Sequence, residues 1–366
     1  MNKNWNIRKS TNNDAENILD CRRRCFPDED IEKQQLIYWE YEFIHNYAGQ
    51  AQNFVAEDNK RIIGFYGVIP QNFIYNDEHH SGAIVVDVMT DPDYRKQGLF
   101  VALGKYAIDY CTNNTDFEFA TGYTVRPDVM PGHLKVGWKV KLKINTWIMP
   151  LSIKELIDKQ IPLSNHFPGL SSLISYIFSP VFRMRSRLLL STNIKHTIKR
   201  LSKCDKFLFD SFWTKFKKSP LENCLIQERT SAYLSWRYDQ NPSRDYTYHV
   251  ALDEKNEIMG FVVSRTSYLL GVKTMIVVDA LFLPGIKRST VKSLLLDVRD
   301  LALKEKCSMC ATMVNQPNLI FPTPWFFGFI RSPYQFNFII HGLKKDTIIN
   351  NPDLGVHLMW GDTDDI

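Results

Sequence analysis

Four consecutive residues in the first third of the chain have types and spacing suited to holding an anion. Arg95, Lys96 and Gln97 carry cationic or polar side chains, and Gly98 lets a ligand approach the backbone closely. An arginine followed three residues later by a glycine is a weak signal by itself. It becomes informative where it joins a strand to a helix, because the N–H groups in a helix's first turn lack intrahelical partners and attract phosphate.

The flanking residues predict that arrangement. The β-branched run Ile84–Val88 is typical of a buried strand, and Pro92 ends it because proline cannot donate to a strand ladder. After Gly98, apolar residues recur at helical spacing, at Leu99, Leu103, Tyr106 and Tyr110. A strand, a short loop with glycine and an amphipathic helix therefore follow one another, and together they predict a phosphate-binding loop. An ordinary turn between a strand and a helix is the alternative.

This stretch resembles motif A of the GNAT superfamily, the acyl-CoA-dependent N-acyltransferases. The family pattern is a strand, V-x-P, two residues, and then Q/R-x-x-G-x-G/A. Its Val, Pro, Q/R and first Gly positions are filled here by Thr90, Pro92, Arg95 and Gly98. Phe100 departs from the pattern, which usually has Gly or Ala at that position.

The resemblance implies acetyl-CoA or another short acyl-CoA as co-substrate, and no metal. It also implies that CoA is held mainly by backbone N–H groups of Arg95, Lys96, Gln97, Gly98, Leu99 and Phe100. The strand that ends at Thr90 would splay away from its neighbour. A backbone N–H near Met89 or Thr90 would then polarise the acyl carbonyl.

His133 is the first candidate for proton transfer. In many GNAT enzymes a tyrosine four residues before a Gly-aromatic pair protonates the CoA thiolate. The pair here is Gly137-Trp138, so His133 holds the equivalent position. An imidazole could give a proton to sulfur or take one from an amine. The alternative is a surface or core histidine on the helix before Gly137.

Two further side chains, those of Asp87 and Arg126, are candidate functional groups, and each also has an ordinary structural explanation. Asp87 lies inside a Val-rich strand, where an acid is costly without a partner or a role. It could accept the ammonium proton, although an acid at the matching position Asp279 favours a structural role. Arg126 could bind an anionic acceptor, but an arginine in a loop is usually solvated.

Composition places the chain among globular proteins. Its 366 residues are enough for two domains, and 44% are apolar and 23% charged. No long apolar window or signal-peptide pattern is present, and seven cysteines favour reduced thiols in the cytoplasm. Cys307 and Cys310 have metal-like spacing without further ligands nearby, so we expect core thiols. A net charge of +5 is mild, and we expect no nucleic-acid partner.

The order of predicted elements over residues 1–150 is that of the GNAT fold, with a mixed, mostly antiparallel central sheet flanked by helices. A short strand at Ile7 precedes a capping box at Thr11–Asp14 that opens a helix through Cys25. A helix over Leu36–Tyr47 and a hairpin over Asn53–Gly67 follow. The phosphate loop, a strand, a helix and a last strand complete the unit.

The second half repeats the landmarks of the first. Asp87 and Asp279 are 192 positions apart, and Gly137 and Gly328 are 191 apart. We therefore predict an α/β (α+β) protein of two tandem GNAT-like domains, residues 1–150 and 207–366, joined by a helical basic linker at 151–206. Thr290 stands where alignment on Pro284 places the counterpart of Gly98, so only the first domain is expected to bind acyl-CoA. The second would be a degenerate partner that supports, or forms a wall of, the acceptor site.

Within the linker, the segment 183–206 is rich in Lys and Arg. Leu190, Ile194, Ile198 and Leu201 would lie on one helical face. A basic amphipathic helix can contact an anionic membrane, but more often its apolar stripe packs on a domain. The sequence leaves both interpretations open, and it does not reveal the oligomeric state.

The leading functional hypothesis is N-acylation of a small amine by an acyl-CoA. The segments Tyr233–Tyr238 and Trp360–Asp364 are similar to those of bacterial enzymes of surface-polysaccharide assembly. That resemblance implies an amino sugar, nucleotide-linked, as acceptor. Three alternatives remain: an aminoglycoside or protein N-acetyltransferase, an aminoacyl-tRNA-dependent peptidyl transferase of tandem GNAT-like fold, and a non-catalytic acyl-CoA sensor.

Overall fold

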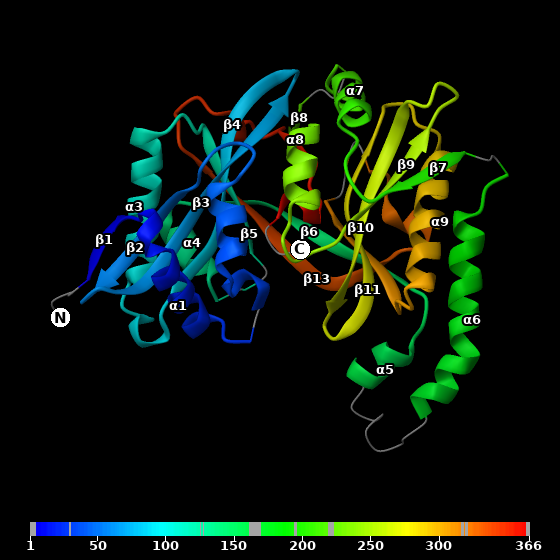
Figure 1. Ribbon diagram of the computed structural model, residues 1–366, viewed down its shortest axis with the longest axis horizontal. Coiled ribbons are helices and arrows are strands. Elements are labelled where there is room, and N and C mark those ends of the chain that lie inside the picture. The colour runs from blue at the N-terminus through cyan, green and yellow to red at the C-terminus, as the bar shows by residue number, and fades with distance from the viewer. Residues whose placement is uncertain are drawn as a thin grey trace.

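One long mixed sheet runs through the whole molecule (Figure 1). The computed structural model describes residues 5–28, 31–124, 126, 128–160, 170–193, 196–218, 223–315, 318 and 321–363. The strands lie in the order β1-β2-β3-β4-β5-β13-β6-β12-β11-β10-β9-β7; off this path, β8 pairs with β3 and β14 pairs with β8. Helices pack against this sheet in both halves of the chain.

The first half supplies the strands β1 (Asn6–Lys9), β2 (Gln52–Asp58), β3 (Arg61–Tyr75), β4 (Glu78–Thr90), β5 (Phe119–Thr124) and β6 (Lys139–Pro150). Its helices are α1 (Ala15–Cys25), α2 (Leu36–Trp39), α3 (Leu99–Asn114) and α4 (Met130–Val136), with short helical turns η1 (Asn12–Asp14), η2 (Ile31–Gln34), η3 (Glu40–Ile44) and η4 (Pro92–Tyr94). The predicted capping box is present, because Thr11 and Asp14 exchange hydrogen bonds at the start of η1. The predicted helix after Leu36 ends at Ile44, in a π-helical turn.

The middle of the chain forms α5 (Lys154–Gln160) and α6 (Leu170–Leu190). The second half supplies β7 (Thr197–Leu201), β8 (Cys224–Gln227), β9 (Thr247–Leu252), β10 (Ile258–Leu269), β11 (Val272–Phe282), β12 (Met309–Val314), β13 (Ile330–Gly342) and β14 (Gly355–Val356). Its helices are α7 (Lys206–Lys217), α8 (Ser231–Leu234) and α9 (Arg288–Lys304), with the turns η6 (Ser235–Asp239), η7 (Pro324–Phe327), η8 (Ile348–Asn350) and η9 (Trp360–Asp362).

The two ends of the sheet are built alike: the strands β1-β2-β3-β4-β5 from one end correspond in position and order to β7-β9-β10-β11-β12 from the other. β4 pairs with β5 in parallel across the helix α3, and β11 pairs with β12 in parallel across the helix α9. The hairpin β2–β3 corresponds to β9–β10 in the same way. The structure therefore confirms the predicted tandem repeat of a GNAT-like fold.

The two halves exchange one strand each, β6 and β13, at the centre of the sheet. β13, from the second half, lies between β5 and β6. β6, from the first half, pairs with β13 and β12, both of which belong to the second half. In Figure 1 these two strands cross the middle of the molecule. Each half is thus completed by a strand of the other, and the predicted boundary at residue 150 stays a prediction.

The predicted linker helix is wrong in its second part. α6 ends at Leu190, and residues 197–201 form the strand β7, antiparallel to β9 at the sheet edge. Ile198 and Leu201 therefore lie on a strand, and Ile194 is outside the described residues. The edge of β9 offers backbone hydrogen bonds to a β-branched segment, and this pairing outweighs the helical spacing.

Several large apolar side chains of α6 are exposed, among them Leu173, Tyr176, Ile177, Val181 and Leu188. Among the described residues, no helix is long and apolar enough to cross a membrane. Contact of this segment with a membrane surface stays a prediction.

Candidate active site

A cavity opens where β4 and β5 diverge. The two strands pair only from Gly82 to Val85 on β4, opposite Phe119 to Gly122 on β5. Beyond Val85 the β4 strand bulges, and Asp87 has a φ of 49°. The space between the strands is a cavity of about 200 Å³. The predicted splay of this strand is therefore present.

At the end of β4, the backbone N–H and C=O groups of Thr90 point away from the neighbouring strand β3. The N–H of Asp91 donates to Ile63 O of β3 at 2.9 Å. Because successive residues of an antiparallel ladder alternate their hydrogen-bonding direction, the N–H and C=O of Thr90 point away from β3. Arg95 Nε indeed donates to Thr90 O, at 3.3 Å. The same alternation turns the Met89 N–H toward β3, so the geometry favours Thr90 as the donor to an acyl carbonyl.

The loop after β4 is braced by Asp91, a residue that the sequence analysis did not single out. Its carboxylate is 1% exposed and accepts from Arg24 Nε at 2.7 Å and from Arg61 Nη2 at 2.8 Å. It also caps η4 by accepting from the Asp93 N–H. Burial alone would raise the pKa of Asp91, but these donors outweigh burial and lower it. The braced loop leads directly to the first turn of α3.

The predicted phosphate loop exposes its backbone at the N-terminus of α3. Gly98 is the N-cap residue, its φ is +82°, and a Cβ built there would meet nothing within 4 Å. Lys96 also has a positive φ, of 62°. Arg95, Lys96, Gln97 and Gly98 are all exposed. The first N–H groups of α3 thus open onto free space, the arrangement that suits a phosphate.

The side chains of Leu99 and Phe100 have packing roles, and the role of their backbone N–H groups in the first turn of α3 stays a prediction. Leu99 is 1% exposed in the core beneath α3. The Phe100 ring packs on α4, where a Cβ added to Gly132 would come within 2.6 Å of it. The glycine at position 132 therefore makes room for the phenylalanine that departs from the family pattern.

His133 lines the cavity and is buried. Its ring lies 5.0 Å from Phe100 and 5.9 Å from Trp138, centroid to centroid. Nδ1 is buried and has no hydrogen-bond partner among the described residues. Burial lowers the pKa of His133 to about 4, so the imidazole is neutral at pH 7. A neutral ring can donate one hydrogen bond into the cavity, but it is a weak proton acceptor.

Asp87 lines the same cavity but belongs to a buried charge cluster, defined here as Arg22, Lys33, Glu42 and Asp87. Its Oδ1 lies 2.6 Å from Arg22 Nη1 and 3.7 Å from Lys33 Nζ, and Lys33 Nζ lies 3.7 Å from Glu42 Oε1. Burial would raise the pKa of Asp87, but the two cations outweigh burial and lower it. The carboxylate is ionised and paired, which suits a structural role better than proton transfer.

The matching acid of the second half has the same kind of partner. Arg229 Nε donates to Asp279 Oδ2 at 2.7 Å, and both side chains are fully buried. In each half, then, an arginine pairs with the acid at the bulge of the equivalent strand. This shared pairing supports the structural interpretation of Asp87.

Arg126 lines the mouth of the cavity and is more than half exposed. It forms an ion pair with Asp128 at 3.0 Å. Its position allows contact with an acceptor, and its predicted role stays a prediction.

The equivalent space in the second half is closed. β11 and β12 pair only from Thr274 to Val277 on β11, so they also diverge. The turn η9 fills the gap: Arg229 Nη2 donates to Asp362 Oδ1 at 2.7 Å, and Tyr238 Oη donates to Asp279 Oδ2 at 3.0 Å. Gly361 packs so closely that an added Cβ would lie 2.3 Å from Tyr238 Oη.

The loop before α9 also differs from the phosphate loop. α9 begins at Arg288, four residues after Pro284, whereas α3 begins seven residues after Pro92. The predicted equivalence of Thr290 with Gly98 is therefore wrong, because Thr290 lies buried inside the first turn of α9. The shorter loop lacks any counterpart of the Arg95–Gly98 segment, which strengthens the prediction that only the first half binds acyl-CoA.

Sequence reasoning missed several other residues that line the cavity, and Tyr123 and Ile339 are two of them. Tyr123 lies at the splayed end of β5, and Ile339 lies on β13. Tyr123 could have been suspected from its place at the end of a strand next to the phosphate loop. Ile339 could not, because only the exchange of β13 brings it there. The second half thus forms part of the cavity wall.

Comparison with known proteins agrees with this geometry. Residues 6–140 match the family model described as an acetyltransferase (GNAT) domain. The first half of the chain is thus similar to a GNAT acetyltransferase domain. No functionally curated protein matches the chain in sequence.

Solved structures share the fold over nearly the whole chain. A GCN5-related N-acetyltransferase from Anabaena variabilis is 12% identical, with a TM-score of 0.59, over 93% of this chain and 73% of that one. N-myristoyltransferase from Saccharomyces cerevisiae with bound myristoyl-CoA is 12% identical, with a TM-score of 0.61, over 98% and 86%. A tandem GNAT protein from the clavulanic acid biosynthesis pathway is 12% identical, with a TM-score of 0.59, over 94% and 100%.

At these identities the solved structures establish the tandem GNAT fold, and the family match concerns the half that holds the open cavity. Together they support an enzyme of the N-acyltransferase class that acts on acyl-CoA. Among the described residues, no group of three or more His, Cys, Asp or Glu side chains could hold a metal ion, and Cys307 and Cys310 are buried free thiols.

Proposed function

We propose that the first half transfers an acetyl or short acyl group from CoA to the amine of a small molecule, a nucleotide-linked amino sugar. The observation that carries the transferase part is the cavity between β4 and β5, which begins beside the exposed first turn of α3. A pyrophosphate at this helix N-terminus would direct the thioester into that cavity.

The small volume of the cavity and the charged residue that lines it support an acyl-CoA with a short acyl group as the donor. Its volume is about 200 Å³, and Asp87 of the buried charge cluster lines it. A long alkyl chain extending in this direction would have to displace ion-paired side chains from their partners, which is costly in a buried site. An acetyl group avoids that cost.

The reaction needs few protein groups. The amine nitrogen attacks the thioester carbonyl carbon, the C–S bond breaks, and the ammonium proton passes to solvent while the thiolate takes up a proton. The Thr90 N–H would stabilise negative charge on the carbonyl oxygen. The neutral His133 imidazole would donate a hydrogen bond to the departing sulfur rather than a full proton, because its pKa of about 4 keeps it uncharged.

The amino-sugar acceptor rests on resemblance alone. The segments that carry this resemblance pack on each other in the second half, where Tyr233 Oη donates to Gly361 O at 3.0 Å. They contribute no side chain to the described lining of the cavity. Three alternatives therefore remain. The protein could be an aminoglycoside or protein N-acetyltransferase, an aminoacyl-tRNA-dependent peptidyl transferase, or a non-catalytic acyl-CoA sensor.

The test is thiol release from a panel of acyl-CoAs, with and without nucleotide-linked amino sugars. Gly98→Glu places a carboxylate where the phosphate would lie and should abolish amine-dependent release. Gly285→Glu is the matched control, because Gly285 also has a positive φ, +76°, and open space around a built Cβ, in the equivalent loop of the second half. We expect that variant to retain activity.

Release that depends on an amino sugar and disappears only in Gly98→Glu would establish both substrates. CoA binding without turnover on any amine would overturn the transferase proposal and favour a sensor. Turnover on another amine alone would overturn the amino-sugar acceptor.

A further inference from the structure

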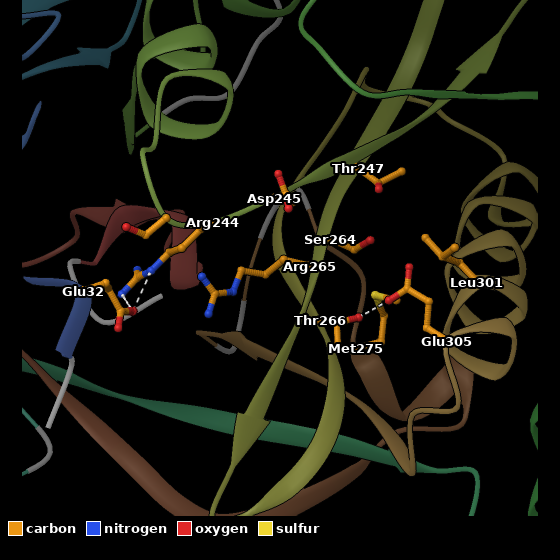
Figure 2. Close-up of a pocket in the computed structure, with 11 residues that line it drawn as sticks. Glu32, Arg244, Asp245, Thr247, Ser264, Arg265, Thr266, Met275, Leu301 and Glu305 are labelled. Atoms are coloured by element: carbon orange, nitrogen blue, oxygen red, sulfur yellow. Dashed lines mark hydrogen bonds and ion pairs between the residues drawn. The ribbon is translucent and has the colours of Figure 1, made fainter. Parts of the chain in front are cut away.

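A second, larger pocket lies where the first half meets the sheet of the second half. Its volume is about 460 Å³ (Figure 2). Glu32 of η2 forms one end, Arg244 precedes β9, Arg265 lies on β10, and Glu305 at the end of α9 forms the other end. It shares no lining residue with the cavity between β4 and β5.

Arg244 lies in this pocket, and one nitrogen of its guanidinium group makes no hydrogen bond to a described residue. Its side chain is 3% exposed. Nε and Nη2 both donate to Glu32 Oε1, at 3.3 and 3.0 Å, as the dashed lines in Figure 2 show. Nη1 is buried and has no hydrogen-bond partner among the described residues. One donor nitrogen of a nearly fully buried cation is therefore left without an acceptor.

Arg265 uses fewer of its donor nitrogens in hydrogen bonds, and its guanidinium carbon lies 5.8 Å from the centre of the Tyr246 ring. Its Nη2 donates to Ser267 Oγ at 2.9 Å, while Nε and Nη1 are buried and lack a hydrogen-bond partner among the residues that the structure describes. In Figure 2 its guanidinium points toward Arg244 and Glu32. Burial, together with the charge of Arg244, lowers the pKa of Arg265. A guanidinium nevertheless stays charged at pH 7, so the pocket holds a cation that no described carboxylate neutralises.

The charges at this end of the pocket do not balance. Two guanidinium groups face the single carboxylate of Glu32, whose pKa they help to lower against the effect of burial. Buried charged donors without acceptors are costly, and native proteins rarely retain them without a role. An oxyanion between the two side chains would accept from Arg244 Nη1 and from Arg265 Nε and Nη1, the forked geometry that arginine offers to phosphate and carboxylate.

We propose that this pocket binds a small hydroxylated molecule through its phosphate or carboxylate group, held by Arg244 and Arg265. The pocket is too large for an oxyanion alone. Its remaining walls carry the polar side chains of Asp245, Thr247 and Thr266. Asp245 is exposed and can accept hydrogen bonds from ligand hydroxyls. The site is separate from the proposed acyl-CoA site and does not depend on it.

The experiment measures anion binding to the full-length protein by calorimetric titration and by thermal shift. The probes are inorganic phosphate, acetate and ribose 5-phosphate. Because phosphate can also occupy the N-terminus of α3, each titration is repeated in Gly98→Glu. Arg265→Met removes the cation that has no carboxylate partner among the described residues, and Lys255→Met removes an exposed positive charge in the turn between β9 and β10 as the matched control.

We expect binding in the wild type, in Gly98→Glu and in Lys255→Met, with ribose 5-phosphate tighter than inorganic phosphate. Arg265→Met should weaken binding about tenfold or more, the effect of losing charge-assisted hydrogen bonds. It should fold normally, because it removes a buried charge. Arg265→Lys, which keeps the charge but not the fork, should also weaken binding.

Equal affinity in the wild type and Arg265→Met would overturn the proposal, as would the absence of any anion-dependent shift. Loss of binding in Gly98→Glu alone would assign the anion to α3 and overturn it too. Equal affinity for inorganic phosphate and ribose 5-phosphate would overturn the claim of a hydroxylated ligand.

Discussion

For His133, the structure changes the role that the sequence had implied. Its position implied a proton donor or acceptor with an ordinary histidine pKa. The structure buries the ring between Phe100 and Trp138 and lowers its pKa to about 4. The side chain therefore lines the cavity of the proposed acyl-CoA site as an uncharged imidazole, and its catalytic role stays a prediction.

This interpretation predicts the pH dependence of stability. The unfolded chain binds a proton at His133 below about pH 6.5, while the native protein does so only near pH 4. Acid therefore favours unfolding: the contribution of His133 is fully present above pH 6.5 and is lost as the pH falls toward 4. Its size is at most about 3 kcal/mol. Urea unfolding at a series of pH values should show this loss in the wild type and a smaller loss in His133→Gln.

The same variant tests the catalytic role. Loss of one hydrogen bond to a departing thiolate should lower kcat by about 10- to 100-fold. An unchanged kcat in both His133→Gln and His133→Phe would remove the residue from the mechanism, whatever the pH dependence of stability shows.

At the scale of elements, the conformation of the predicted phosphate loop depends on contacts with residues outside the loop. Asp91 ties the end of β4 to α1 through Arg24 and to β3 through Arg61. Gly98 supplies the positive φ that lets the chain turn into α3. The loop therefore keeps its shape before any ligand arrives, which reduces the ordering cost of binding.

Asp91→Asn should loosen this loop. Losing the two charge-assisted contacts of a buried carboxylate should lower the free energy of unfolding by about 1–3 kcal/mol and raise the KM for acyl-CoA. Asp93→Asn is the control, because the Asp93 side chain is 74% exposed and its pairing with Arg61 is solvated. Equal KM values for the two variants would show that Asp91 does not shape the loop.

At the scale of the molecule, the exchange of β6 and β13 joins the two halves into one sheet. β6 forms ladders only with β12 and β13 among the described strands, so the first half lacks a neighbour for its last strand without the second. We therefore expect the folding of one half to depend on the other. The cavity wall formed by Ile339 is a consequence of the same exchange.

This exchange predicts a single cooperative unfolding transition. Val55 on β2 and Val250 on β9 are both fully buried and lie at corresponding places in the two halves. Substitution of either by alanine should destabilise the protein by about 2–3 kcal/mol and move the whole calorimetric transition. Two transitions, of which each variant moves only one, would show that the halves unfold independently.

The sequence by itself determined the local elements and the position of the glycine-containing loop between β4 and α3. Hydrophobic periodicity, the proline after β4 and the glycine before α3 are local signals, and each acts through backbone conformation within a few residues. The tandem repeat was readable for the same reason, because the same local landmarks occur twice in the same order.

The tertiary structure alone decided what depends on distant contacts. The pairing of residues 197–201 with β9, the exchange of β6 and β13, the closing of the second cavity by η9, and the burial of His133 all follow from strand edges and charges far apart in the chain. Hydrogen-bonding edges and buried charges select their partners in space, and no periodicity along a single segment records that choice.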